Sequence, residues 1–202
     1  MERIFSFCRI PPGGFVINFS TSPVLYRARA PYDRVTKLIT LISWVGLIFL
    51  NLFIMYQMII HEAPLELFIT ITFLLLTTTF GILIGTFLFS PRGYEITLDG
   101  IVVKRYLGSF KIPYDRIIDA RRVKWTWKGM RLCASGGLHG FFGLFKIAGV
   151  GNVWMYVKNR SKMILIKTVN GTQYVISPED PDEFLRKLGE ISSKEGMKIR
   201  KK

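Results

Sequence analysis

Two long apolar runs dominate the hydrophobic pattern of the chain. Residues 38–60 and residues 67–89 each span 23 residues without a charged side chain, and only six residues separate them. An α-helix rises about 1.5 Å per residue, so about 20 apolar residues cross the roughly 30 Å hydrocarbon layer of a bilayer. One such run could be a buried core helix, but two in succession favour a transmembrane helical hairpin.

Beyond residue 93 the pattern changes to short runs with the period of two that is typical of β-strands. Residues 94–98 and 101–105 flank Asp99-Gly100, and residues 163–169 and 172–176 flank Asn170-Gly171. Two-residue hairpin turns prefer Asp-Gly and Asn-Gly, so both pairs of runs are predicted to be β-hairpins. Further strands are expected at residues 110–113, 119–124 and 153–157.

An amphipathic helix is predicted near the C-terminus. Asp180 can cap it, Pro181 suits its first position, and Glu183 completes a capping box. Its apolar face consists of Phe184, Leu185, Leu188 and Ile191. The expected organisation is therefore an N-terminal cytoplasmic segment (residues 1–36), the hairpin (37–91), a mostly β domain (92–192) and a basic tail (193–202).

The N-terminal segment has no clear pattern. It is not a signal peptide, because Arg9, two prolines and two glycines interrupt its apolar residues. Residues 15–19 could form a short strand or lie along the membrane interface. We expect an ordered segment that packs on the β domain or on a partner.

Charge gives the hairpin an orientation. The chain has 28 Lys and Arg against 14 Asp and Glu, a net charge of +14. Basic residues precede the first helix and follow the second, whereas the linker between the helices has none. The positive-inside rule therefore predicts a cell-membrane protein with two spans, a cytoplasmic β domain and two cytoplasmic termini. Cys8 and Cys133 form no C-x-x-C motif, so they are expected to be reduced cytoplasmic thiols rather than metal ligands.

Polar and small residues inside the hairpin are candidates for helix packing. Asn51 lies near mid-depth and is expected to hydrogen-bond Thr77 or Thr78 across the hairpin. A transport role is the alternative, but two helices alone cannot enclose a pathway. Thr77, Gly81 and Gly85 form a stripe of small residues that could pack the hairpin or a homo-oligomer.

A basic and aromatic cluster is the main candidate binding surface of the β domain. It consists of Arg116, Arg121, Arg122, Lys124, Trp125, Trp127, Lys128 and Arg131. Beside a membrane, anionic lipid headgroups are the favoured ligand. A solvated face and a contact with a sister subunit are the alternatives, and nucleic acid is disfavoured although such residues can bind it.

A glycine-rich stretch, residues 136–145, allows two interpretations. Phe141 and Phe142 could be exposed on a bent edge strand and contact a bilayer or another subunit, or they could lie in the core of a kinked strand. The stretch lacks the Gly-Lys-Ser/Thr of a phosphate-binding loop. His139 lies within it, but no motif positions the further groups that a catalytic histidine needs.

Four motifs together resemble the prokaryotic PH-domain families. They are Tyr94-x-Ile-x-Leu-Asp99-Gly100-Ile101, Lys111-Ile-Pro-Tyr-x-x-Ile117, Gly137-x-x-Gly140-x-Phe142-Gly143, and Val175-Ile-Ser-Pro-Glu-Asp-Pro-x-x-Phe184. The resemblance implies a partly open, seven-stranded all-β barrel capped by the C-terminal helix, and these families often carry a preceding membrane hairpin. It implies no catalytic residues. Phosphoinositide recognition is not carried over, because the loop that binds these lipids in eukaryotic PH domains is only Asp99-Gly100 here.

The sequence as a whole predicts a non-enzymatic, membrane-anchored adaptor. Its expected partners are anionic lipid, a partner protein or further copies of itself, without a metal or cofactor. The alternative is an accessory subunit of a larger membrane complex for transport or translocation.

Overall fold

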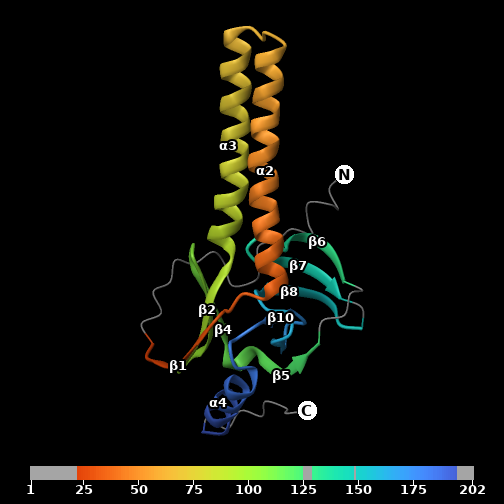
Figure 1. The fold of residues 1–202 in the computed structure, drawn as a ribbon. Helices are drawn as coiled ribbons and strands as arrows, with labels where there is room; N and C mark the ends of the chain where they lie inside the picture. The colour runs from red at the N-terminus through yellow and green to blue at the C-terminus, as the bar shows by residue number, and fades with distance from the viewer. Residues whose placement is uncertain (1–21, 125–128, 148, 195–202) are drawn as a thin grey trace.

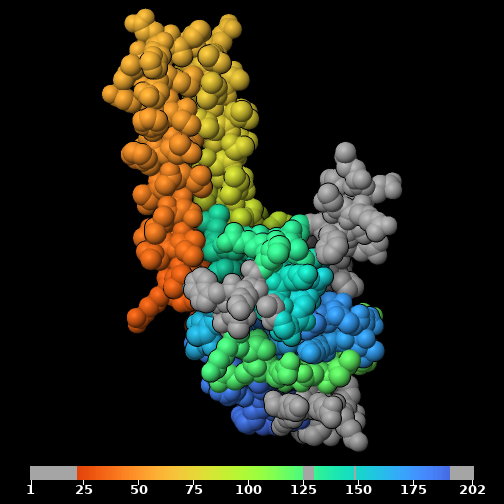
Figure 2. All heavy atoms as spheres, turned by 90° about the vertical axis from the view of Figure 1, so that its right-hand side faces the viewer, coloured from red at the N-terminus to blue at the C-terminus, as the bar shows by residue number. Residues whose placement is uncertain are grey.

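The computed structural model describes residues 22–124, 129–147 and 149–194. Two long antiparallel helices, α2 (Arg34–Ile60) and α3 (Leu65–Phe89), rise from a β-rich head as a single rod (Figure 1). Both are long and apolar enough to cross a membrane. Most of their large apolar side chains are exposed, as Figure 2 shows for the bare rod. An exposed apolar surface of this size fits a hydrocarbon environment better than water.

The first sheet of the head contains a strand that the sequence pattern did not predict. β1 (Val24–Arg29) precedes the hairpin in the chain, yet it pairs antiparallel with β2 (Pro91–Thr97), which follows the hairpin. β3 (Gly100–Arg105) and β4 (Ser109–Pro113) complete the strand order β1-β2-β3-β4. The expectation that the N-terminal segment packs on the head is therefore correct for residues 24–29, whereas residues 1–21 lie outside the described part of the chain.

The second sheet has six strands in the order β5-β9-β10-β8-β7-β6. A short 3-10 helix, η2 (Tyr114–Arg116), leads into it. The strands are β5 (Ile117–Val123), β6 (Gly129–Gly136), β7 (Phe141–Ile147), β8 (Gly151–Val157), β9 (Met163–Thr168) and β10 (Gln173–Ile176). The pairs β2/β3 and β9/β10 are the two hairpins that the Asp-Gly and Asn-Gly turns predicted.

The head therefore has a PH-like architecture that is open rather than closed. Instead of the expected seven strands, nine described strands follow the hairpin and β1 adds a tenth, because β6 and β7 form an extra pair across the glycine-rich stretch. The helix α4 (Pro181–Lys194) caps the structure. Its N-terminus is capped as predicted, since an Asp180 carboxylate oxygen accepts the backbone N–H groups of Asp182 and Glu183 at 3.0 Å each.

The main core lies where the two sheets and α4 meet. Its buried side chains include Tyr94, Ile96, Val103, Phe110, Ile164, Ile166, Phe184 and Leu188. Alternate positions on the strands supply them, so the opposite face of the first sheet is left for polar side chains. A second core cluster lies on the other side of the six-stranded sheet and includes Phe141, Phe145, Met155 and Leu165.

Candidate functional site

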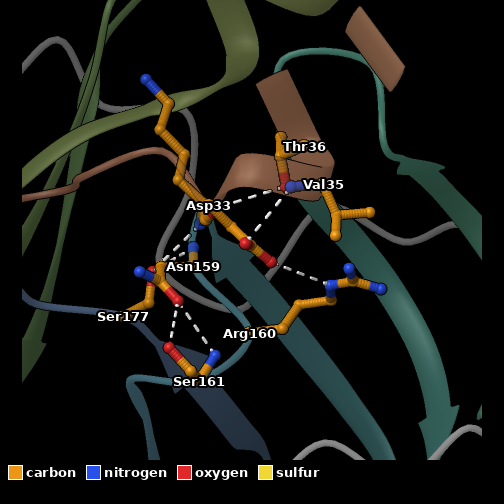
Figure 3. Close-up of polar contacts among 8 residues, drawn as sticks. Asp33, Val35, Thr36, Asn159, Arg160, Ser161 and Ser177 are labelled. Carbon is orange, nitrogen blue, oxygen red and sulfur yellow. Dashed lines mark hydrogen bonds and ion pairs between the residues drawn. The ribbon is translucent and has the colours of Figure 1, made fainter. Parts of the chain in front are cut away.

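The head and the hairpin are joined through a buried, hydrogen-bonded junction. The Asp33 backbone N–H donates to the Lys158 carbonyl (3.0 Å), and the Thr36 hydroxyl donates to the same oxygen (3.2 Å). The Asp33 carboxylate also caps α2 at Val35 and accepts a bond from Arg160 Nε (3.3 Å), as Figure 3 shows. The start of α2 is therefore fixed to the end of β8 rather than connected through a free linker.

His139 connects both α2 and α3 to the β6–β7 loop. Its Nε2 atom accepts from Trp44 Nε1 of α2 (3.5 Å), and its Nδ1 atom lies 3.2 Å from Thr86 Oγ1 of α3. Because the indole can only donate, Nε2 is unprotonated and Nδ1–H donates to Thr86, whose own hydroxyl donates to the Ile82 carbonyl (2.7 Å). Burial and the nearby charge of Lys158 lower the pKa of His139, which favours this neutral form. The histidine therefore has a positioning role in the structure.

Lys158 is an unusual charged group at the same junction. It is only 1 % exposed, and its ammonium lies 4.2 Å from the ring centroid of Tyr32 and 5.1 Å from that of Tyr106. The structure shows no ion pair for Lys158 among the described residues. Burial lowers its pKa to about 8.

The described residues of the predicted basic cluster lie on different parts of the head. Arg121, Arg122 and Lys124 belong to β5 and its end, which lies beside α4 at the end of the head opposite the hairpin in both Figure 1 and Figure 2. Arg122 pairs with Asp182 of α4 (2.8 Å). Arg131 is on β6, at the other edge of the same sheet. Arg116 precedes β5 on η2, and Trp125, Trp127 and Lys128 lie outside the described residues.

A second basic surface, which sequence reasoning missed, lies on the outer face of the first sheet. We call it the sheet hollow: a depression of about 440 Å³ lined by Arg27, Ala28, Arg29, Arg92, Gly93, Tyr94, Glu95, Lys104 and Arg105. Glu95 is the acidic group in this lining, and it pairs with Arg27 (2.7 Å) and Lys104 (2.8 Å). Arg29, Gly93 and Lys104 occupy one register level across β1, β2 and β3. The sequence signal for this surface lies in the basic residues that flank the hairpin, among them Arg27, Arg29 and Arg92.

One contact predicted inside the hairpin, the hydrogen bond of Asn51, differs in the structure. The Asn51 side-chain amide donates to Thr79 Oγ1 (3.0 Å) and to the Leu47 carbonyl (2.7 Å), so the expected partner, Thr77 or Thr78, is wrong. Thr77 is exposed and the Thr78 hydroxyl bonds the carbonyls of its own helix, because only one of three successive threonines can face α2. Asn51 itself is buried between the helices.

The glycine stripe does not pack within the hairpin. A Cβ atom added at Gly81 or Gly85 would meet no atom within 4 Å. Leu83, which is 1 % exposed, is buried instead. The stripe therefore does not pack α2 against α3, and its contact with a second copy of the chain stays a prediction.

The aromatic residues of the glycine-rich stretch belong to the core. Phe141 is 6 % exposed and packs in the second core cluster, and Phe142 packs against the main core. Phe141 is therefore not available for the oligomer contact that the sequence allowed. The two residues are adjacent on β7 and therefore point to opposite faces of the sheet, and a core cluster covers each of these faces.

Cys133 differs from its predicted state. It is disulfide-bonded in the structure rather than a reduced thiol, and the other cysteine, Cys8, lies outside the described residues. Across the described ranges, no group of three or more His, Cys, Asp or Glu side chains is arranged to hold a metal ion.

Comparison with known proteins identifies the head. Residues 92–191 match the family described as "Bacterial PH domain". The match begins at the first residues of β2 and ends within α4, so β1 and the hairpin lie outside it. No curated protein and no solved structure matches the chain.

Proposed function

The chain belongs to the bacterial PH domain family through residues 92–191, and from this membership we propose that it is a non-enzymatic, membrane-anchored adaptor. Domains of this kind are typically non-catalytic binding modules. The hairpin holds the head permanently at the cytoplasmic leaflet, where the head binds anionic lipid, a partner protein or further copies of the chain.

The observation that carries this proposal is the close coupling of the head to the hairpin. β1 ends at Arg29 and α2 begins at Arg34, while α3 ends at Phe89 and β2 begins at Pro91. Two connections this short, together with the buried junction at His139 and Lys158, leave no linker on which the head could move away from the bilayer. The chain therefore acts as a fixed platform at the membrane rather than as a module that is recruited to it.

Two indicators of the compartment disagree. The basic residues that flank the hairpin support a cytoplasmic head, whereas the disulfide at Cys133 is typical of an oxidising compartment. The charges favour a cytoplasmic head more strongly, because several independent residues carry that signal and intracellular disulfides also occur in hyperthermophiles.

The basic residues of the predicted cluster are proposed to contact two kinds of partner. Arg121, Arg122 and Lys124 are proposed to contact an acidic partner protein, because their end of the head points away from the hairpin (Figure 1). Arg116 is proposed to join that contact, and Trp125, Trp127 and Lys128 stay proposed binding residues for the same partner. Arg131, on β6 at the hairpin side, is proposed to contact anionic lipid.

The second candidate function is an accessory subunit of a larger membrane complex. The open positions at Gly81 and Gly85 favour it, since small residues let another helix approach closely. Extraction in a mild detergent followed by mass measurement separates the candidates. Foreign subunits in fixed stoichiometry support the complex, whereas a species made of this chain alone supports the adaptor.

Cysteine labelling tests the orientation on which the adaptor proposal depends. In a background with Cys8 and Cys133 replaced by serine, His61→Cys reports on the linker and Asp115→Cys on the head, and both positions are exposed. A membrane-impermeant maleimide applied to intact cells is expected to label the protein carrying H61C only. Labelling of the D115C protein under the same conditions would contradict a cytoplasmic head.

A further inference from the structure

We propose that the sheet hollow binds the phosphate of an anionic lipid headgroup. This inference rests on the proposed function, because it requires the head to be held at the membrane surface. It adds a specific site and a chemical class of ligand. The site is separate from the β5 cluster that the sequence indicated.

The charge of the hollow favours an anion. Arg27, Arg29, Arg92 and Lys104 carry four positive charges against the carboxylate of Glu95, which leaves a net charge of +3. Arg105 also borders the hollow, but its guanidinium lies 5.8 Å from the buried Phe110 ring, on the core side of the sheet. Glu95 is only 2 % exposed and holds Arg27 and Lys104 in place at 2.7 and 2.8 Å. Neither Arg29 nor Arg92 forms an ion pair among the described residues, and both are exposed. An arginine fork matches two phosphate oxygens at once, so these two guanidinium groups suit a phosphate.

The shape of the hollow depends on Gly93. This residue lies between Arg29 on β1 and Lys104 on β3, and on a flat antiparallel sheet its side chain would fill the space between them. A Cβ atom at this position would lie only 2.9 Å from the Ala28 carbonyl oxygen. Glycine therefore permits the close approach of β1 and leaves open space between two cationic side chains.

Arg92 reaches the hollow because of a bulge. Pro91 pairs with Arg105 and Gly93 pairs with Lys104, so Arg92 is the additional residue in β2. A β-bulge redirects the side chain of the inserted residue. The bulge places one more residue at this level of the sheet than a regular strand would, and this residue supplies the fourth cation of the hollow.

The position of the hollow matches the depth of lipid headgroups. Arg92 follows the last residue of α3, Phe89, by three positions, and β2 continues directly below α3 in Figure 1. The Arg105 guanidinium lies 5.9 Å from the Phe89 ring, and the Leu107 backbone N–H donates to the Leu88 carbonyl (2.8 Å). The headgroup layer begins where the apolar helix ends, so a lipid phosphate beside α3 lies next to the hollow.

The hollow is also distinct from the headgroup loop of eukaryotic PH domains. That loop corresponds to the β2–β3 turn at Asp99-Gly100, which lies at the opposite end of β2 from Pro91. Asp99 is engaged there by Lys111 (3.1 Å). The end of the sheet that faces the membrane is therefore the end with the cationic hollow.

Binding of short-chain lipids to the delipidated full-length protein in detergent tests the proposal. The probes are dioctanoyl phosphatidic acid, dioctanoyl phosphatidylcholine and inorganic phosphate. The test variant is Arg29→Gln/Arg92→Gln, and the matched control is Arg121→Gln/Arg122→Gln, which removes the same charge from the far end of the head. Affinity is measured by native mass spectrometry or thermophoresis.

We expect the wild type to prefer phosphatidic acid over phosphatidylcholine. The test variant should weaken phosphatidic acid binding at least about tenfold, as the loss of charged hydrogen bonds implies, and the control should leave it unchanged. Equal weakening in both variants would show diffuse charge attraction and overturn the site. Unchanged binding in the test variant would also overturn it. Equally tight binding of inorganic phosphate would reassign the hollow to a soluble anion.

Two controls keep the result interpretable. If the double variant fails to fold, as judged by its thermal unfolding, the exposed single variant Arg92→Gln replaces it with the same expectation. The labelling experiment on the orientation of the head is independent of the hollow. Unchanged binding together with cytoplasmic orientation refutes this inference alone, whereas a head labelled from outside refutes the proposed function.

Discussion

Replacing Lys158 by methionine should stabilise the protein near neutral pH. The lysine is buried at the junction between head and hairpin, with its ammonium above the rings of Tyr32 and Tyr106. Burial lowers its pKa from the ordinary 10.5 to about 8. Each pKa unit corresponds to about 1.4 kcal/mol, so holding the charge in the folded protein costs about 3 kcal/mol.

Replacing the lysine removes this cost, but it also removes the two contacts between the ammonium and the aromatic rings. Each cation–π contact is worth about 0.5–2 kcal/mol. Methionine has a similar length and no charge, and it keeps favourable contacts with aromatic rings. The two cation–π contacts together are worth about 1–4 kcal/mol, and the thioether regains about 0.3–1.5 kcal/mol on each ring. Central values give a net stabilisation of about 2 kcal/mol for Lys158→Met at pH 7.

The pH dependence gives the sharper test. Below pH 8 the lysine is charged in both states, and the full cost is present. Between pH 8 and 10.5 the unfolded state binds more protons, so the stability of the wild type rises with pH through this window. Above pH 10.5 the lysine is neutral in both states, so the free-energy cost of burying its charge is absent. The difference between variant and wild type should therefore shrink from pH 8 to 10.5.

Thermal unfolding of the full-length protein in detergent, followed by tryptophan fluorescence, measures this difference. Lys124→Met is the matched control, because it removes the same charge at an exposed position. A destabilised K158M protein at pH 7, or a difference independent of pH, would refute the reasoning.

Three other predictions concern the head and the hairpin. Phe184→Ala removes a fully buried ring that meets Tyr26 edge-on at 6.2 Å, so urea unfolding should show a loss of about 3–5 kcal/mol, and a loss below about 1 kcal/mol would contradict the α4 packing. Asp180→Ala should lower the melting temperature through loss of the α4 cap; its hydrogen bonds lower the pKa of Asp180, so the advantage of the wild type is present above pH 3.8 and fades as the pH falls below it. A double-mutant cycle with Asn51→Ala and Thr79→Val in mixed micelles should give a coupling of about 0.6 kcal/mol, whereas the same cycle with Thr78→Val should give none.

Local signals in the sequence were sufficient for several elements. The length of two uncharged runs predicted the hairpin, because the thickness of the bilayer alone sets that requirement. Asp99-Gly100 and Asn170-Gly171 predicted two β-hairpins, because the turn and both strands are contiguous in the chain. Asp180 and Pro181 predicted the start of α4 for the same reason.

The candidate sites required the tertiary structure. A period of two in the sequence assigns side chains to two faces of a strand, but it does not say which strands pair. β1 joins β2 across the whole inserted hairpin, and this pairing alone brings Arg27 and Arg29 next to Arg92 and Lys104. Long-range pairing also moved Arg131 to the sheet edge opposite Arg121.

The sequence by itself therefore determined the class of the protein: two helices long and apolar enough to span a membrane, followed by a PH-like head. Its helices, turns and caps depend on neighbouring residues. Only the tertiary structure decided how the head is fixed to the hairpin through His139 and Lys158, and where its cations gather. The physical reason is that burial and charge proximity arise from contacts between residues far apart in the chain, which local patterns do not encode.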